Sequence, residues 1–102
     1  MSKITKQGDQ TVVRPGRDII ASIAQEMRSE LQTSIKEVVK EMVIDLREVK
    51  MIDSIGLGVL IATYNSLNQD GKKLTVTNAS QDIFKLFQSL RLDQYIEVQK
   101  AG

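Results

Sequence analysis

The stretch from Val43 to Leu60 constrains the fold most, because its hydrophobic pattern changes period half-way along. Before the change, residues 42–44 are apolar and partly β-branched, and Leu46 closes the run, as in a strand buried inside a sheet. After Ser54, apolar residues recur every three or four positions, which is the spacing of one helix face: Leu57, Leu60, Ile61 and Tyr64. The sequence therefore predicts a strand over 41–46, a short loop, and a helix that begins at Ser54.

Ser54 stands where the loop meets this helix, which is the place of an N-cap residue. One interpretation is an ordinary capping serine, whose hydroxyl accepts a hydrogen bond from a backbone N–H of the first turn. The other is a regulatory phosphoacceptor, because a phosphate there gains the helix dipole and free N–H groups and adds a charge of about −1.5 to −2. Gly56 and Gly58 leave little side-chain bulk around the first turn. Position alone leaves both interpretations open.

The composition argues against several kinds of chemistry. The 102 residues are enough for one domain with a single core. The 14 basic and 13 acidic residues give a net charge of +1, so there is no basic footprint for nucleic acid. Neither cysteine nor histidine is present, which excludes thiol chemistry, Cys/His metal sites and histidine acid–base catalysis. We therefore expect no catalytic residue, no metal site and no direct contact with nucleic acid.

The hydropathy pattern favours a soluble, cytoplasmic protein. No apolar run approaches the ~20 residues that cross a membrane, and the first residues lack the apolar segment of a signal peptide. The lack of disulfides fits a reducing compartment. We expect no association with a membrane.

Periodicity and turn residues place the remaining elements. Asp18 follows a Pro-Gly pair and is the candidate N-cap of a helix from Ile19 to about Lys36, whose apolar stripe indicates a core face. Ser80 is the candidate N-cap of a later helix over 81–90. Two strands over 2–7 and 11–14 are predicted to be joined by a Gly-Asp turn. The Ser54 helix is predicted to end at about Asn68, and two further strands are predicted over 73–78 and 96–98. Helices between successive strands favour parallel pairing, so we predict an α/β fold with a mixed sheet of four to five strands and helices packed on it.

Asp45 and Asp53 form a candidate pair of carboxylates near the Ser54 hydroxyl. Such a pair suggests a magnesium site or a general base. Neither a phosphate-binding glycine loop nor a histidine accompanies them. We therefore do not expect an enzyme, and Asp53 is better explained as a residue that shapes the loop or touches a partner.

The central motif has a family resemblance. The run Asp53-Ser54-Ile55-Gly56-Leu57-Gly58-Val59, preceded by Val43-Ile44-Asp45-Leu46 and Met51-Ile52, resembles the signature of the STAS family. More narrowly, it is similar to that of the stand-alone bacterial anti-sigma-factor antagonists. The resemblance extends over residues 38–98 and implies that residues 1–102 form one STAS domain.

The chain departs from the family pattern in two places. Ile55 stands where many relatives carry a second Ser or Thr, so no alternative acceptor lies beside Ser54. Residues 1–15 are shorter and less apolar than the family's opening hairpin.

The resemblance implies a phosphorylation switch. In the family, the serine directly after the aspartate is phosphorylated by the partner serine kinase, which is the anti-sigma factor, and this position is Ser54 here. The unmodified protein binds the anti-sigma factor and frees a sigma factor, phosphorylation disrupts the binding, and a separate protein phosphatase resets the switch. The implied partner-binding residues surround the acceptor: Asp18, Asp53, Ser54, Ile55, Gly56 and Leu57.

We expect this chain to bind no cofactor. ATP is the cofactor of the kinase, which agrees with the lack of a G-x-x-x-x-G-K-[ST] loop in this chain. The alternative to a switch is a constitutive docking or scaffold subunit of a signalling or transport complex, in which Ser54 only caps a helix.

Overall fold

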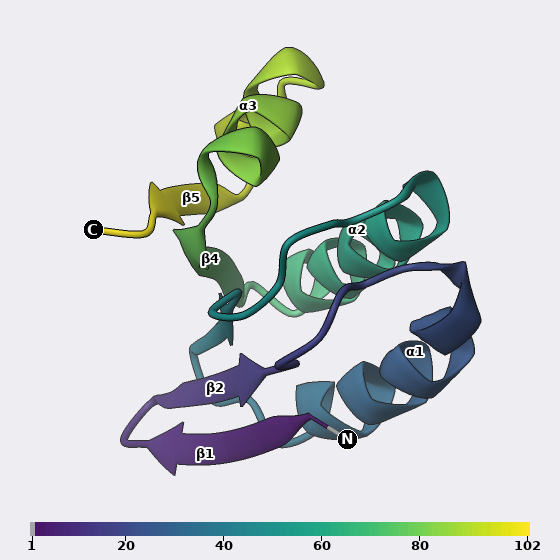
Figure 1. Cartoon of the computed structure of the whole chain (residues 1–102). Coiled ribbons are helices and arrows are strands. Elements are labelled where there is room, and N and C mark those ends of the chain that lie inside the picture. Colours follow the sequence, from purple (N-terminus) through teal and green to yellow (C-terminus); the bar gives the residue numbers. More distant parts are fainter. Residues whose placement is uncertain (1) are drawn as a thin grey trace.

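Helices and tight turns separate the five strands of the sheet, in the order that the hydrophobic periods predict (Figure 1). The computed structural model describes residues 2–102. Its elements in chain order are β1 (Lys3–Gln7), β2 (Gln10–Arg14), α1 (Ala21–Ile35), β3 (Glu41–Asp45), α2 (Ser54–Gln69), β4 (Lys73–Ala79), α3 (Gln81–Ser89), a 3-10 turn (Leu92–Gln94) and β5 (Glu97–Lys100).

The sheet is mixed, and its strands lie in sequence order from β1 to β5. β1 and β2 form an antiparallel hairpin that turns at Gly8, whose φ of 61° is favourable for glycine. The other neighbouring pairs are parallel, because a helix carries the chain back between them. The predicted α/β fold with a mixed sheet is confirmed, and the N-terminal hairpin is part of it.

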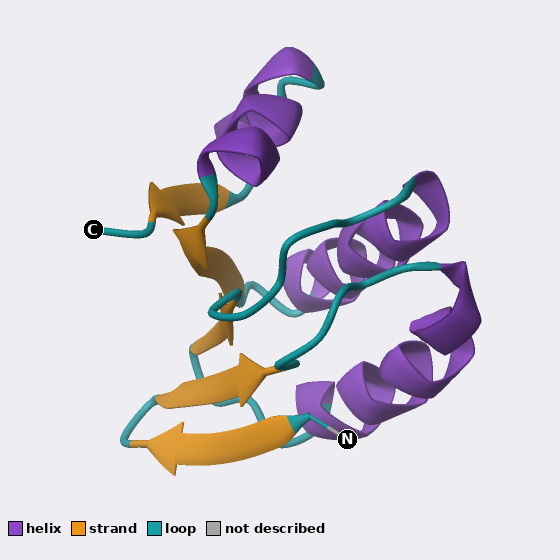
Figure 2. Cartoon of the chain, viewed as in Figure 1, coloured by secondary structure: helices purple, strands orange, loops and turns teal. Residues whose placement is uncertain are grey.

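The core lies between the sheet and its helices. α1 and α2 pack against each other and run side by side along the sheet (Figure 2). Alternate strand residues point toward the helices and are buried, as the two-residue period of a strand requires: Val13, Met42, Ile44, Leu74 and Val76. The three helices add buried side chains to the same cluster, among them Met27, Leu60 and Phe87.

Polar side chains on neighbouring strands pair with each other across the sheet. Gln10 donates from Nε2 to Glu41 over 2.7 Å, and Lys73 lies 2.9 Å from Glu97. The hydrogen bond and charge of Glu97 raise the pKa of Lys73, and Lys73 lowers the pKa of Glu97. Both side chains are exposed, so this ion pair contributes little to stability.

Two predicted elements differ from the observed ones by two residues at a boundary. The first helix begins at Ala21 and not at Ile19, because Ile19 is fully buried and pairs in parallel with Ile52 as extended chain. The last strand is β5 at 97–100, shifted from 96–98, and Ile96 is a core residue. Ser80 caps α3 as predicted, since its hydroxyl accepts a hydrogen bond from a backbone N–H. No helix within residues 2–102 has the length and apolar character needed to cross a bilayer.

The first testable consequence concerns the core. Leu67 on α2 is 0% exposed, whereas Leu90 after α3 is 50% exposed. Leu67→Ala should lower the free energy of unfolding by about 2–5 kcal/mol, because it leaves a cavity among buried side chains. The matched Leu90→Ala change should stay within about 0.5 kcal/mol of wild type. Urea denaturation followed by circular dichroism measures both, and equal effects would contradict the placement of the core.

Candidate functional site

The loop between β3 and α2 is fastened to the segment that precedes α1. Asp18 accepts hydrogen bonds from the backbone N–H groups of Lys50 and Met51, at 2.7 and 3.1 Å from Oδ1. The N–H of Ile19 donates to the carbonyl of Met51 at 3.0 Å, and the N–H of Asp53 donates to the carbonyl of Ile19 at 3.3 Å. The loop therefore has a fixed position although much of it lies at the surface.

The prediction that Asp18 caps the first helix is wrong. The N-cap of α1 is Ile20, which has no side-chain capping bond. Asp18 instead serves the loop that follows β3, more than 30 residues away in the chain. The physical reason is the pairing of Ile19 with Ile52, which keeps the chain extended beyond Asp18 and moves the helix start to Ala21.

Asp53 caps two helices with one carboxylate. Its Oδ1 accepts the N–H of Gly56 in the first turn of α2 at 2.8 Å, and its Oδ2 accepts the N–H of Ala21 at the start of α1 at 2.8 Å. Both N–H groups belong to the first turns of helices, where intrahelical partners are missing. Residues far apart in the sequence thus meet at a single side chain.

The prediction that Ser54 is the N-cap of its helix is wrong as well. Asp53 has the extended backbone of an N-cap, with φ −89° and ψ 179°, and its carbonyl accepts the N–H of Leu57 as the first helical bond. Ser54 is the first residue inside α2 and is exposed. Asp53 is therefore the residue that caps α2. The Ser54 hydroxyl lies at the positive end of the helix and does not cap it.

The same hydrogen bonds act on the charge of Asp53. The N–H donors of Gly56 and Ala21 stabilise the carboxylate form and lower the pKa of Asp53 below its usual range. Two helix dipoles point their positive ends at this carboxylate, and both favour a negative charge there. Asp53 is therefore a poor proton acceptor, which argues against its use as a general base.

Gly56 allows α2 to approach the segment before α1. A Cβ on Gly56 would lie 1.9 Å from the carbonyl oxygen of Ile19, so no larger residue fits without moving the backbone. Gly58, two residues further on, has open space at the same place. The two glycines of the motif thus have different roles, and only Gly56 is needed for packing.

The predicted partner-binding residues divide into a surface group and a supporting group. Ser54 and Ile55 are exposed, and Ile55 keeps 53% of its surface accessible. Gly56 and Leu57 are buried, and the carboxylates of Asp18 and Asp53 are occupied by backbone N–H groups. The structure brings all six residues to one place, and binding to a partner stays a prediction for them.

Met51 is the surface residue that sequence reasoning missed. It lies three positions before Ser54, and 56% of its surface is exposed. An apolar residue in a short loop was the available signal, but it is equally typical of a side chain that turns inward, as Ile52 does.

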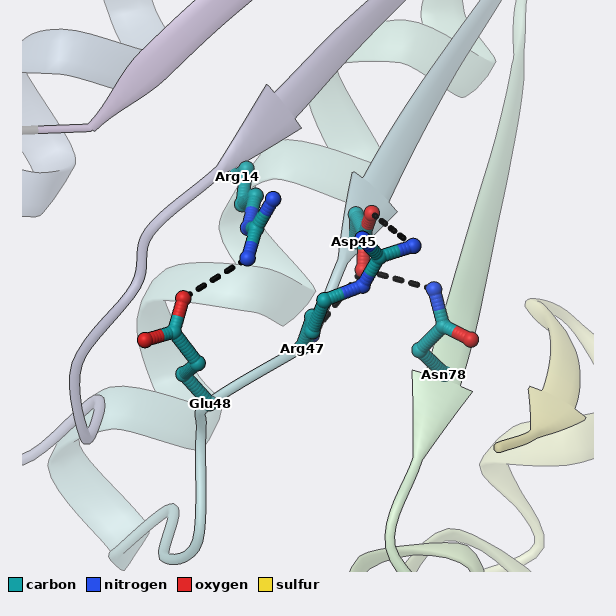
Figure 3. A network of polar contacts seen from close by, with 5 residues as sticks. All are labelled: Arg14, Asp45, Arg47, Glu48 and Asn78. Atoms are coloured by element: carbon teal, nitrogen blue, oxygen red, sulfur yellow. Dashed lines mark hydrogen bonds and ion pairs between the residues drawn. The ribbon is translucent and has the colours of Figure 1, made fainter. Parts of the chain in front are cut away.

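Asp45 belongs to a separate polar network at the end of β3 (Figure 3). Its Oδ1 accepts hydrogen bonds from Asn78 on β4 at 2.8 Å and from the backbone N–H of Arg47 at 2.9 Å. Beside it, Arg14 pairs with Glu48 at 2.7 Å. Asp45 and Asp53 thus have different partners, and residues 2–102 contain no cluster of three or more acidic side chains suited to a metal.

A family model of the STAS domain matches residues 2–101. The chain belongs to the STAS domain family. Over 58 residues it is 38% identical to the anti-sigma-B factor antagonist of Listeria monocytogenes, and this alignment covers 57% of the chain and 51% of that protein. The chain thus spans about half the length of this relative.

Solved structures share the fold at low sequence identity. An anti-sigma factor antagonist from Mycobacterium paratuberculosis superposes with a TM-score of 0.85 at 21% identity, over 97% of this chain and 84% of that one. The phosphorylated form of SpoIIAA, a Bacillus cell fate determinant, gives a TM-score of 0.75 at 17% identity, over 96% and 90% of the two chains. The observed mixed sheet and helices are therefore those of the STAS fold.

The two glycines give a matched test of the site's packing. Gly56→Ala should lower the free energy of unfolding by about 3 kcal/mol or more, because the added Cβ collides with a backbone oxygen that cannot rotate away. Gly58→Ala should raise it by about 0.5–1 kcal/mol, because alanine has the higher helix propensity and meets nothing. Thermal and urea unfolding measure both, and a Gly56→Ala variant as stable as wild type would refute the close approach.

Asp53 also predicts a pH dependence. Its pKa is lowered in the folded state, so its stabilising contribution is present above the unfolded-state pKa of about 3.9 and is lost as the pH falls through the folded-state value. Asp53→Asn removes this contribution, and its stability should fall less between pH 7 and pH 3 than that of wild type. Asp93→Asn, at an exposed aspartate of the 3-10 turn, is the control. Urea midpoints across the pH range decide the point: identical pH profiles for wild type and Asp53→Asn would contradict it.

Proposed function

We propose that this protein is a phosphorylation-switched antagonist of an anti-sigma factor. Its unmodified form binds an anti-sigma factor that is also a serine kinase, and so releases a sigma factor for transcription. Phosphorylation of Ser54 ends the binding, and a protein phosphatase restores it. The exchange takes place in the cytoplasm, where transcription occurs.

The observation that carries the proposal is the placement of Ser54. Its hydroxyl belongs to the first residue of α2 and is exposed, while Asp53 and Asp18 hold the surrounding loop through four hydrogen bonds to backbone N–H groups. A kinase therefore meets an accessible acceptor in a fixed setting. The naming of the Listeria relative as an anti-sigma-B factor antagonist and the phosphorylated form of the Bacillus neighbour agree with this role.

The chain itself supplies an acceptor and a surface in this proposal, and no catalysis. The kinase brings ATP and transfers its γ-phosphoryl group to the Ser54 oxygen, which loses its proton, and ADP leaves. The new charge of about −1.5 to −2 opposes the contact by repulsion and by the cost of removing its hydration. Asp53 stays ionised and bonded to the two helix starts, so it keeps the acceptor in place.

Substitutions at Ser54 test the switch. Ser54→Ala should block phosphorylation and keep partner binding, and its stability should stay within about 0.5 kcal/mol of wild type because Asp53 provides the cap. Ser54→Asp should weaken binding at least about tenfold, which corresponds to 1.4 kcal/mol. Ser66→Asp, at another exposed serine on α2, is the control and should bind as wild type does.

The measurement uses purified kinase-type anti-sigma factors from the source organism, each incubated with ATP and the protein. Phosphopeptide mapping identifies the acceptor, and titration calorimetry gives the affinities. A phosphate on Ser54 with weakened binding supports the proposal. If Ser54→Asp and wild type bind with equal affinity, or if no such kinase modifies Ser54, the constitutive docking module becomes the better account.

A further inference from the structure

Two large exposed apolar side chains flank the acceptor serine. Met51 and Ile55 are 56% and 53% exposed, and they lie three positions before and one position after Ser54. The remaining exposed large hydrophobic residues within 2–102 are distributed over other elements: Ile4, Val39, Leu90 and Tyr95. Contiguous apolar surface is typical of a site that a partner covers, and Met51 is contiguous with three further apolar residues because it lines one groove with them.

A groove continues this apolar surface toward α3. It has a volume of about 340 Å³ and lies between the loop before Ser54 and the first two turns of α3, lined by Lys50, Met51, Ile52, Asp82, Ile83 and Leu86. Four of these six residues are apolar. The two charged ones, Lys50 and Asp82, have opposite signs, so the groove has no net charge that would select a phosphate or another ion.

We infer that the anti-sigma factor places an apolar side chain in this groove, so that its contact runs from Ser54 across Met51 to Leu86 on α3. The inference rests on the proposed function and adds the surface by which the partner is recognised. The occupant is an apolar side chain because the walls are apolar and the rim charges cancel. The groove adjoins the acceptor: Ile52 and Ser54 are two residues apart, which is at most about 7 Å of chain.

This placement determines how the phosphate acts. A phosphate on Ser54 lies at the border of an apolar contact and must lose part of its hydration when the partner binds. Salt does not remove that penalty, whereas it screens repulsion between exposed charges beyond about 8 Å at 0.15 M. The loss of affinity caused by Ser54→Asp should therefore change less than about threefold between 50 and 500 mM salt.

The direct test replaces the apolar side chains of the groove. Met51→Ser and Leu86→Ser should each weaken binding of the purified anti-sigma factor at least tenfold in titration calorimetry. Val39→Ser is the matched control, because Val39 is 60% exposed and lies just before β3, at the opposite end of that strand from the loop. It should bind within twofold of wild type. Met51 is largely exposed, so its variant keeps the fold, and urea denaturation verifies this for all three.

The outcomes separate this inference from the proposed function. If wild type binds the kinase and Ser54→Asp does not, while Met51→Ser and Leu86→Ser bind as wild type, the switch stands and the groove is not its docking site. If wild type binds no kinase, the proposed function itself fails. Sedimentation analysis adds one more outcome: a wild-type dimer that Met51→Ser converts to a monomer would assign the groove to a second copy of the chain and overturn the inference.

Discussion

The double hydrogen bond of the Asp53 carboxylate holds the site together. One oxygen accepts an N–H from the first turn of α2 and the other accepts the first N–H of α1. Helix starts are regions of partial positive charge, and two of them brought together would repel each other without a shared anion. Asp53 supplies that anion, so Ser54 beside it has a fixed place at the start of α2.

Backbone contacts complete this arrangement. Ile19 pairs with Ile52, and Asp18 binds the backbone of the preceding loop residues, so the segments before α1 and α2 run together as a short parallel pair. Gly56 lets the first turn of α2 touch the carbonyl of Ile19. Main-chain contacts thus fix the position of the surface around Ser54, and the exposed side chains there contribute little to the stability of the fold.

The hydrophobic pattern of the sequence was sufficient for the helices and the inner strands, because buried apolar residues mark them. The first strand has no such pattern, since all five residues of β1 are exposed, and only the Gly-Asp turn indicated a hairpin there. The sequence also singled out Ser54. The capping role of Ser80 was predicted correctly, whereas those of Asp18 and Ser54 were misassigned, because capping depends on which N–H groups come near a side-chain oxygen in space. Nothing in the residues around Asp18 indicates that it serves Lys50, or that Ala21 bonds to Asp53 more than 30 positions away. Met51 was missed for a related reason, since a loop pattern does not say on which side an apolar side chain lies.

The shared carboxylate has a consequence for local opening. The amide hydrogens of Ala21 and Gly56 bond to the same side chain, so movement of Asp53 exposes both at once. The beginnings of α1 and α2 therefore belong to one cooperative unit for hydrogen exchange, although Ala21 and Gly56 are 35 positions apart in the chain. A partner that clamps Ser54 against the protein would slow exchange at the start of α1 as well, at a helix it need not touch.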